Sequence, residues 1–193
     1  MRLKFLFSLF AAFGLSACTS VPLASLPKLA RIDFMTTDLS RVRVALALPT
    51  ALAPKPQGVV MEMKYKVGEE LEQVVSLHLD ESKLTQDLQG LPTDQPKGQA
   101  LHVFKLLATD VMHLNALRQS VADAKKQNQK GSLGLGIAAR EFCKLSDLPL
   151  GPALTTTYVL TSETETYVTM VQDFNLRSDA KTAEGLDKLE TCR

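Results

Sequence analysis

Four segments of this chain alternate apolar residues with polar or small ones at a period of two, which limits what the chain can fold into. In 41–48, for example, Val42, Val44, Leu46 and Leu48 fall on one face, and Arg41 and Arg43 on the other. Successive side chains of a β-strand point to opposite faces, so this pattern predicts a half-buried strand. The same pattern predicts strands over 41–48, 58–67, 71–80 and 132–143. Two more strands are predicted over 154–162 and 165–174, which are rich in Thr, Tyr and Val, residues that favour strands.

Between the third and fourth predicted strands, apolar residues recur every three or four positions and no longer every second position. Apolar residues recur at helical spacing over 99–127, from Leu101 to Val121, and predict one long helix that ends before Gly131. Residues 81–98 carry two prolines and two glycines and are predicted to form a long loop. The order is therefore three strands, one helix, three strands. We expect an α+β domain, with an antiparallel sheet or sandwich of about six strands and the helix packed on one face.

The first 17 residues are organised like an export signal. Arg2 and Lys4 give a basic start, and the following apolar run, 5–13, is interrupted only by Ser8. This run is too short for a permanent membrane span, which needs roughly 20 apolar residues. A basic start, a short apolar core and small residues before a cleavage site are typical of a secretory signal peptide, predicted here over 1–17.

The next residues carry the most specific motif in the sequence. Leu15-Ser16-Ala17-Cys18 resembles the lipobox of bacterial lipoproteins, in which an aliphatic residue and two small residues precede a cysteine. The resemblance covers this segment alone. It implies that Cys18 becomes the first residue of the mature chain and carries acyl chains such as palmitate, which anchor it to a membrane. Thr19 at the next position implies the outer membrane, with the domain facing the periplasm.

Removal of the signal also sets the expected domain organisation and charge. We expect a flexible tether over 18–29 and a single envelope-facing domain over 30–193. The mature chain has 20 basic and 21 acidic residues, so it lacks the concentrated positive field that nucleic-acid binding needs. Arg31, Arg41 and Arg43 form the one basic cluster. We interpret it as a solvated face, with contact to anionic lipid head groups as the alternative.

Two cysteines remain once Cys18 carries lipid. Cys143 and Cys192 are a candidate disulfide, because an oxidising envelope compartment permits one. Two free thiols are the alternative, since sequence alone does not give the distance between them.

No motif in the sequence supports a catalytic, cofactor-binding or metal site. The predicted helix places His102 and His113 about 16 Å apart, too far to share a metal ion. His78 lies on the polar face of a predicted strand with Asp80. The glycines of 134–139 superficially resemble a dinucleotide loop, but they open a predicted strand where such a loop opens a helix.

The sequence therefore favours a membrane-anchored, non-catalytic module that binds or helps to assemble another envelope component. One alternative is a carrier of an apolar ligand such as a lipid, with Met61 and Met63 beside strand 132–139 lining an adaptable cavity. Another alternative is a hydrolase of envelope polymers, assembled from residues distant in the sequence.

Overall fold

The structure is a computed structural model, and it describes residues 21–68, 71–92 and 97–192. The predicted signal peptide and Cys18 lie outside these residues. None of the helices in the described ranges is long and apolar enough to cross a membrane.

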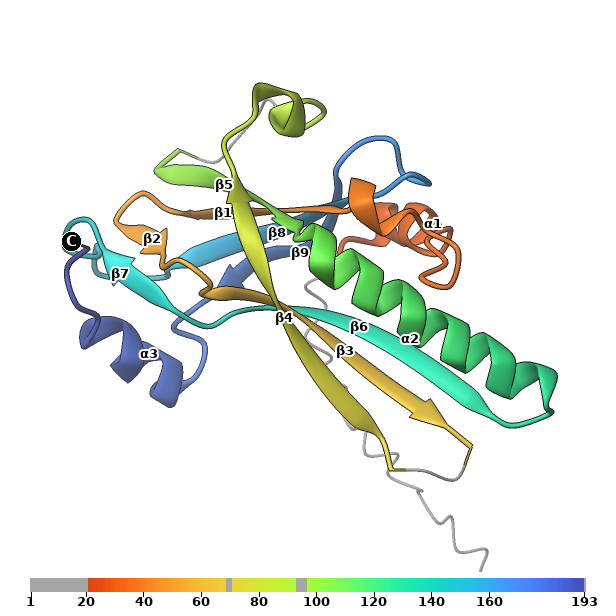
Figure 1. Ribbon diagram of the computed structural model, residues 1–193. Coiled ribbons are helices and arrows are strands. Elements are labelled where there is room, and N and C mark those ends of the chain that lie inside the picture. Colours follow the sequence, from red (N-terminus) through yellow and green to blue (C-terminus); the bar gives the residue numbers. More distant parts are fainter. Residues whose placement is uncertain (1–20, 69–70, 93–96, 193) are drawn as a thin grey trace, which may run out of the picture.

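A curled seven-stranded antiparallel sheet forms the body of the protein (Figure 1), which confirms the predicted α+β class. The strand order is β6-β3-β4-β5-β1-β8-β9. The strands are β1 (Arg43–Pro49), β3 (Val59–Val67), β4 (Gln73–Ser82), β5 (Gln99–Leu106), β6 (Gly131–Ala139), β8 (Leu154–Leu160) and β9 (Val168–Asn175).

Strand β1 lies near the centre of the sheet, between β5 and β8. Val44 pairs with Phe104 on one side and with Val159 on the other. Val44 through Leu48 are all buried, so β1 is covered on both faces. The outer-facing Ala45 and Ala47 have small side chains, which pack with Tyr158 and Tyr167 in a separate apolar cluster.

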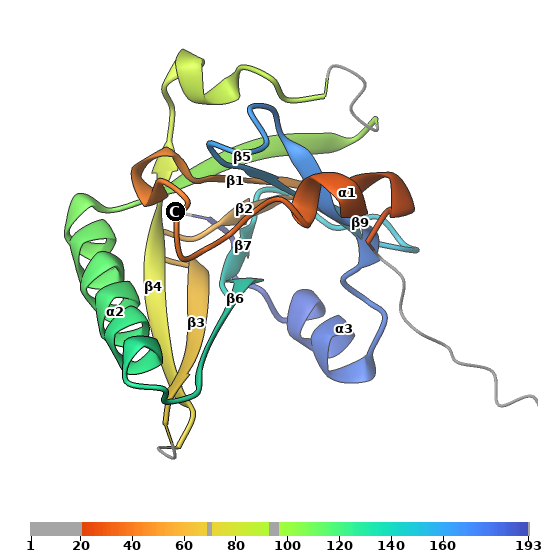
Figure 2. The same ribbon diagram turned by 90° about the vertical axis from the view of Figure 1, so that its right-hand side faces the viewer.

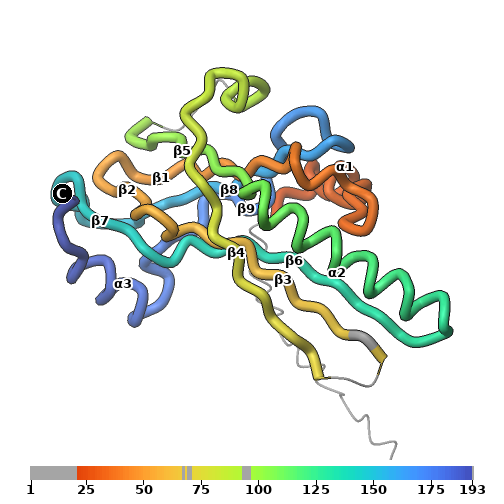
Figure 3. The backbone as a smooth tube through the Cα atoms, viewed as in Figure 1, coloured from red at the N-terminus to blue at the C-terminus, as the bar shows by residue number. Residues whose placement is uncertain are grey.

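Strand β4 divides its length between two partners and so produces the curl of the sheet. Its first part, Gln73–His78, pairs with β3, and its last part, Leu79–Ser82, pairs with β5. The backbone trace shows β4 running from the β3 hairpin to the β5 side of the molecule (Figure 3). The inner side chains Leu77 and Leu79, on either side of this change of partner, are both buried in the main core.

Helix α2 (Ala108–Lys126) covers the inner face of β3 and β6. Leu114 and Val121 are almost fully buried, while the exposed face of the helix is mostly polar apart from Met112. The predicted helix over 99–127 was wrong in its first part, because Gln99–Leu106 forms β5. Apolar residues at 101, 103, 104 and 106 suit either structure, and pairing with β1 and β4 selects the strand.

A second, two-stranded sheet joins β2 (Leu52–Pro54) to β7 (Phe142–Lys144). The predicted strand 132–143 therefore divides into β6 and β7, which belong to different sheets. Helix α3 (Ala180–Asp187) lies in the polar C-terminal segment and packs Leu186 against Leu52 and Ala153. Asp179 caps α3 by accepting a hydrogen bond from the backbone N–H of Thr182 at 2.9 Å.

The described part of the predicted tether has regular structure. A 3-10 turn, Leu23–Ser25, leads directly into helix α1 (Leu26–Leu29), and both contact β9. Pro27 lies at the start of α1, where a missing N–H costs no hydrogen bond. Residues 29–37 then cross the open side of the curled sheet, and we call this segment the strap.

The structure brings Cys143 and Cys192 to disulfide-bonding distance, with Cα atoms 5.0 Å apart. Cys143 lies on β7, and Cys192 follows α3 near the C-terminus. The N–H of Cys192 also donates to the carbonyl oxygen of Lys144 at 2.9 Å. A bond between these cysteines would attach the C-terminal segment to the small sheet.

We predict that replacing both cysteines by alanine lowers the free energy of unfolding by about 4 kcal/mol, because a cross-link over a separation of 49 residues restricts the unfolded chain. Denaturant unfolding of the oxidised protein and of the double variant measures the difference. The reduced protein should match the variant. Two reactive thiols in the oxidised protein after unfolding would contradict the pairing.

Candidate functional site: an apolar crevice between two sheet edges

The two edge strands of the curled sheet, β6 and β9, do not pair with each other. Helix α2 lies on one side of the opening, and β9 and α1 lie on the other (Figure 2). An apolar crevice with a cavity of about 150 Å³ lies between the two edges, under the strap.

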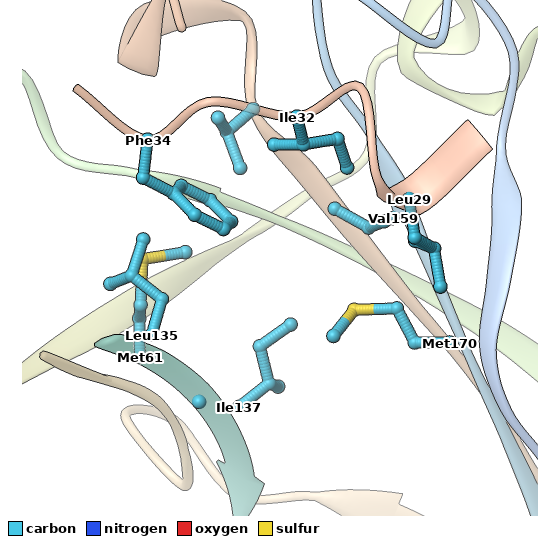
Figure 4. A pocket seen from close by; sticks show the side chains of 10 residues that line it. Leu29, Ile32, Phe34, Met61, Leu135, Ile137, Val159 and Met170 are labelled. Carbon is cyan, nitrogen blue, oxygen red and sulfur yellow. The ribbon is translucent and has the colours of Figure 1, made fainter. Parts of the chain in front are cut away.

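Three walls form this crevice (Figure 4). The strap contributes Leu29, Ile32 and Phe34 from above. Met61 of β3 and Leu135 and Ile137 of β6 form the floor, and Val159 of β8 and Met170 of β9 close the remaining side. No charged side chain lines the crevice.

The pleat of β6 explains its contribution to the floor. Leu133, Leu135 and Ile137 are half-buried and pack on the main core, whereas Ser132, Gly134 and Gly136 are exposed on the other face. The sequence predicted this alternation correctly. Leu135 and Ile137, which line the crevice, are themselves only half-buried.

A second hollow of about 310 Å³ continues between the same two strands. Ile137 lines both spaces, so the two hollows adjoin at this side chain. The walls of the second hollow come from β1, β6, β8 and β9, with Phe142 and Leu176 at its end. Thr155 and Thr157 are the polar residues that line it. The two spaces follow one another along the gap, which suits an elongated apolar molecule.

Arg118 of α2 holds the carboxyl end of the strap in place. Its Nη1 donates to the carbonyl oxygen of Thr37 at 2.8 Å, and both residues are buried. Burial lowers the pKa of Arg118, and the neighbouring carboxylates of Asp33, Glu163 and Asp38 oppose that shift by stabilising the cation. A buried arginine therefore connects the strap to the helix.

The strap also carries its own local turn. The backbone N–H of Met35 donates to Asp33 Oδ1, and the N–H of Thr37 donates to the Asp33 carbonyl oxygen, both at 2.8 Å. Asp33 is exposed and does not line the crevice, whereas its neighbours Ile32 and Phe34 do (Figure 4). The turn therefore directs two apolar side chains into the crevice.

A buried polar cluster lies outside the crevice, around Asp87. Arg43 Nε donates to Asp87 Oδ1 at 2.8 Å, Ser82 Oγ donates to Oδ2, and the hydroxyl of Tyr167 donates to the Asp87 carbonyl oxygen. Burial alone would raise the pKa of Asp87, but the hydrogen bonds from Ser82 and Arg43 reverse this and lower it. Burial raises the pKa of Tyr167.

The polar groups of this cluster bond to one another, and none of its residues lines the crevice or the second hollow. We therefore interpret the cluster as structural. It joins the segment after β4 to β1 and to the β8–β9 connection. It also changes the interpretation of the basic cluster, because Arg43 is half-buried and paired with Asp87, whereas Arg31 and Arg41 are exposed.

The three histidines lie on three different elements. His102 is on β5, where its Nδ1 lies 2.8 Å from Glu81 Oε1, so the expectation that it shares a helix with His113 was wrong. His113 is on α2, and His78 is on β4 with its Nδ1 2.8 Å from the carbonyl oxygen of Gln57. Within 21–68, 71–92 and 97–192, no three metal-ligating side chains converge.

Of the residues singled out in the sequence, the structure brings Cys143 and Cys192 together and places Met61 in the crevice. Met63 is fully buried in the core beside it. Cys18 lies outside the described residues. Residues 30–37 of the strap were predicted to lie in the folded domain, but no element and no part in a site was assigned to them. The alternation of Arg31, Ile32, Asp33 and Phe34 is the signal that could have revealed the strap.

No protein-family model, curated protein or solved structure matches this chain. The geometry of the crevice and of the sheet edges therefore carries the functional argument.

We predict that Asp87→Asn lowers the free energy of unfolding by about 3 kcal/mol at neutral pH, because it leaves the half-buried Arg43 without its carboxylate. The folded-state pKa of Asp87 is below its ordinary value of 3.8. The stabilisation is therefore complete above that value and is lost as pH falls through the folded-state pKa. Denaturant unfolding of both proteins at several pH values measures this, and a difference independent of pH would contradict it.

Proposed function

We propose that this protein is a membrane-anchored, non-catalytic binding protein of the bacterial envelope whose ligand is the hydrocarbon chain of a lipid or fatty acid. The observation that carries the proposal is the crevice between β6 and β9, which is open, apolar and free of charged side chains along its lining. Cys18 would anchor the domain to the membrane, where such ligands occur.

The composition of the walls supports a hydrocarbon ligand. Burial of apolar surface contributes about 25 cal/mol per Å², and the crevice offers no charged group that would select a polar ligand. Met61 and Met170 face the space from opposite walls (Figure 4), and their unbranched side chains adapt to ligands of varied shape. Apolar cavities of about 150 Å³ can bind small hydrocarbons.

The elongated arrangement of the two hollows supports a chain-like ligand. A hydrocarbon chain lying past Ile137 would occupy both spaces, and its polar end would lie near Thr155 and Thr157 or in solvent beyond the strap. Movement of the Ile137 side chain between rotamers is the change that would join them.

A fluorescent fatty acid, 11-(dansylamino)undecanoic acid, tests this proposal. The full chain carrying Cys18→Ser, purified without detergent, should bind one molecule with increased dansyl emission. Ile137→Phe should weaken binding at least about tenfold, because the larger ring occupies the junction of the two hollows. Ser132→Phe is the matched control, because it adds the same ring to the exposed face of β6. Absence of binding, or equal binding by both variants, would refute the proposal.

The proposed anchor has a separate test. Cells grown with labelled palmitate should incorporate the label into the wild-type chain and not into the Cys18→Ser variant. The label should fractionate with the outer membrane, since Thr19 implies that address. An unlabelled wild-type chain that keeps its leader would exclude lipid anchoring, whatever the result of the fatty-acid titration.

A further inference from the structure

The free edge of β6 suggests a second binding surface. We propose that β6 accepts an extended segment of a partner protein as an added antiparallel or parallel strand, and that this segment alternates apolar with acidic residues. The inference goes beyond the crevice ligand, because it rests on the backbone of the edge and on the charges around it.

The hydrogen bonds at both ends of β6 show which backbone groups face outward. At one end, the N–H of Gly68 donates to the carbonyl oxygen of Lys130 at 2.7 Å. At the other end, the N–H of Arg140 donates to the carbonyl oxygen of Gly58 at 2.8 Å. Hydrogen-bonded pairs recur at every second residue of an antiparallel ladder, so the even-numbered residues of β6 bond to β3. The odd-numbered residues therefore direct their N–H and C=O groups to the free edge: Gly131, Leu133, Leu135, Ile137 and Ala139.

This edge lacks the features that protect most edge strands. Over its nine residues β6 has no charged residue, no proline and no register shift against β3. Strand β9, at the other edge, has register shifts against β8 and contacts α1. No described segment other than β3 pairs with β6. Of the two edges, β6 is therefore the one suited to strand addition.

The charges around β6 disfavour the symmetric pairing of two copies of this chain centred on Leu135. Lys130 precedes β6 and Arg140 follows it. Antiparallel pairing of two copies centred on Leu135 would place Lys130 of each chain opposite Arg140 of the other. Like charges directly opposite destabilise a strand pair. The edge therefore favours a different chain that carries acidic residues.

The outer face of the sheet adds to this preference. On β3, Lys64 lies opposite Gly134 and Lys66 lies opposite Ser132. The one acidic residue of β3 is Glu62, and it pairs with Arg140. Strands are spaced by about 4.8 Å, so a lysine side chain on β3 is long enough to reach over the small residues of β6 toward an added strand. Acidic side chains on the outer face of that strand would meet Lys64 and Lys66.

The inner face of β6 determines which side chains the partner segment should carry at its remaining positions. A strand beside β6 would direct every second side chain to the side of Leu135 and Ile137, next to the open crevice. Apolar side chains are favoured there. The partner segment is thus apolar toward the crevice and acidic toward the lysines, which is an ordinary strand-addition mode of recognition.

A fluorescein-labelled eight-residue peptide that alternates valine and glutamate is the probe, and the same peptide with lysine in place of glutamate is its control. The full chain carrying Cys18→Ser should bind the glutamate peptide at least tenfold more tightly by fluorescence anisotropy. Hydrogen exchange should show new protection at the amides of Leu133, Leu135 and Ile137. Equal binding of the two peptides, or binding without protection there, would overturn the proposal.

A charge-reversal pair at one position separates the charge effect from a structural one. A Cβ at Gly134 meets only the carbonyl oxygen of Lys64 at 3.9 Å, an ordinary contact. The Gly134→Glu variant should bind the glutamate peptide about tenfold more weakly than the wild type does. The Gly134→Lys variant should bind the same peptide at least as tightly as the wild type. Equal loss in both variants would overturn the proposal. A second result would also overturn it: a dimer seen by sedimentation without peptide, with the β6 amides already protected from hydrogen exchange. The occupant of the edge would then be a second copy of this chain.

The fatty-acid titration run on the same variants keeps the two proposals distinct. Both Gly134 variants should bind 11-(dansylamino)undecanoic acid like the wild type, because Gly134 does not line the crevice. Failure of fatty-acid binding would leave the result of the peptide experiment unchanged.

Discussion

The division of β4 between two partner strands is the constraint on which the rest of the structure depends. Because one strand pairs first with β3 and then with β5, the outer strands β3 and β6 turn away from the plane of β1, β8 and β9. The inner face becomes concave, and the main core fills most of it with α2. The sheet curls without closing, and β6 and β9 remain separate edges.

The crevice is a direct consequence of that incomplete closure. Side chains that would form the centre of a closed barrel instead face a gap, which the strap covers only in part. Arg118 and the turn at Asp33 hold the strap over the gap with polar contacts on its far side, so its apolar residues remain available to line the space. The proposed ligand would supply the apolar contacts that the unpaired edges lack.

The same geometry places two kinds of surface beside each other. The concave side of β6 is apolar, its edge offers unpaired backbone groups, and its outer side is bordered by lysines. A hydrocarbon chain uses the first of these surfaces. An added strand uses the edge and the lysines and directs its apolar side chains toward the first. This arrangement would suit a protein that acts at the membrane surface with another envelope component.

The sequence alone determined the elements whose pattern is local. Period two at Val42–Leu48 and at Leu133–Ala139 correctly indicated strands. The strand at Val42–Leu48 was predicted to be half-buried, but β1 is buried on both faces because a second apolar cluster covers its alanines. The end of α2 before Gly131 was likewise predicted from that glycine. The lipobox resemblance at Cys18 is also a local pattern, and it stays a prediction that labelled palmitate will test.

Only the tertiary structure decided features that depend on distant contacts. Gln99–Leu106 has apolar residues compatible with helix or strand, and the neighbouring strands β1 and β4 select the strand by pairing with it. The distance between Cys143 and Cys192, the path of the strap and the gap between β6 and β9 all follow from how the sheet curls. The physical reason is that periodicity states which face of a segment is buried, whereas strand pairing across long separations decides what that face is buried against.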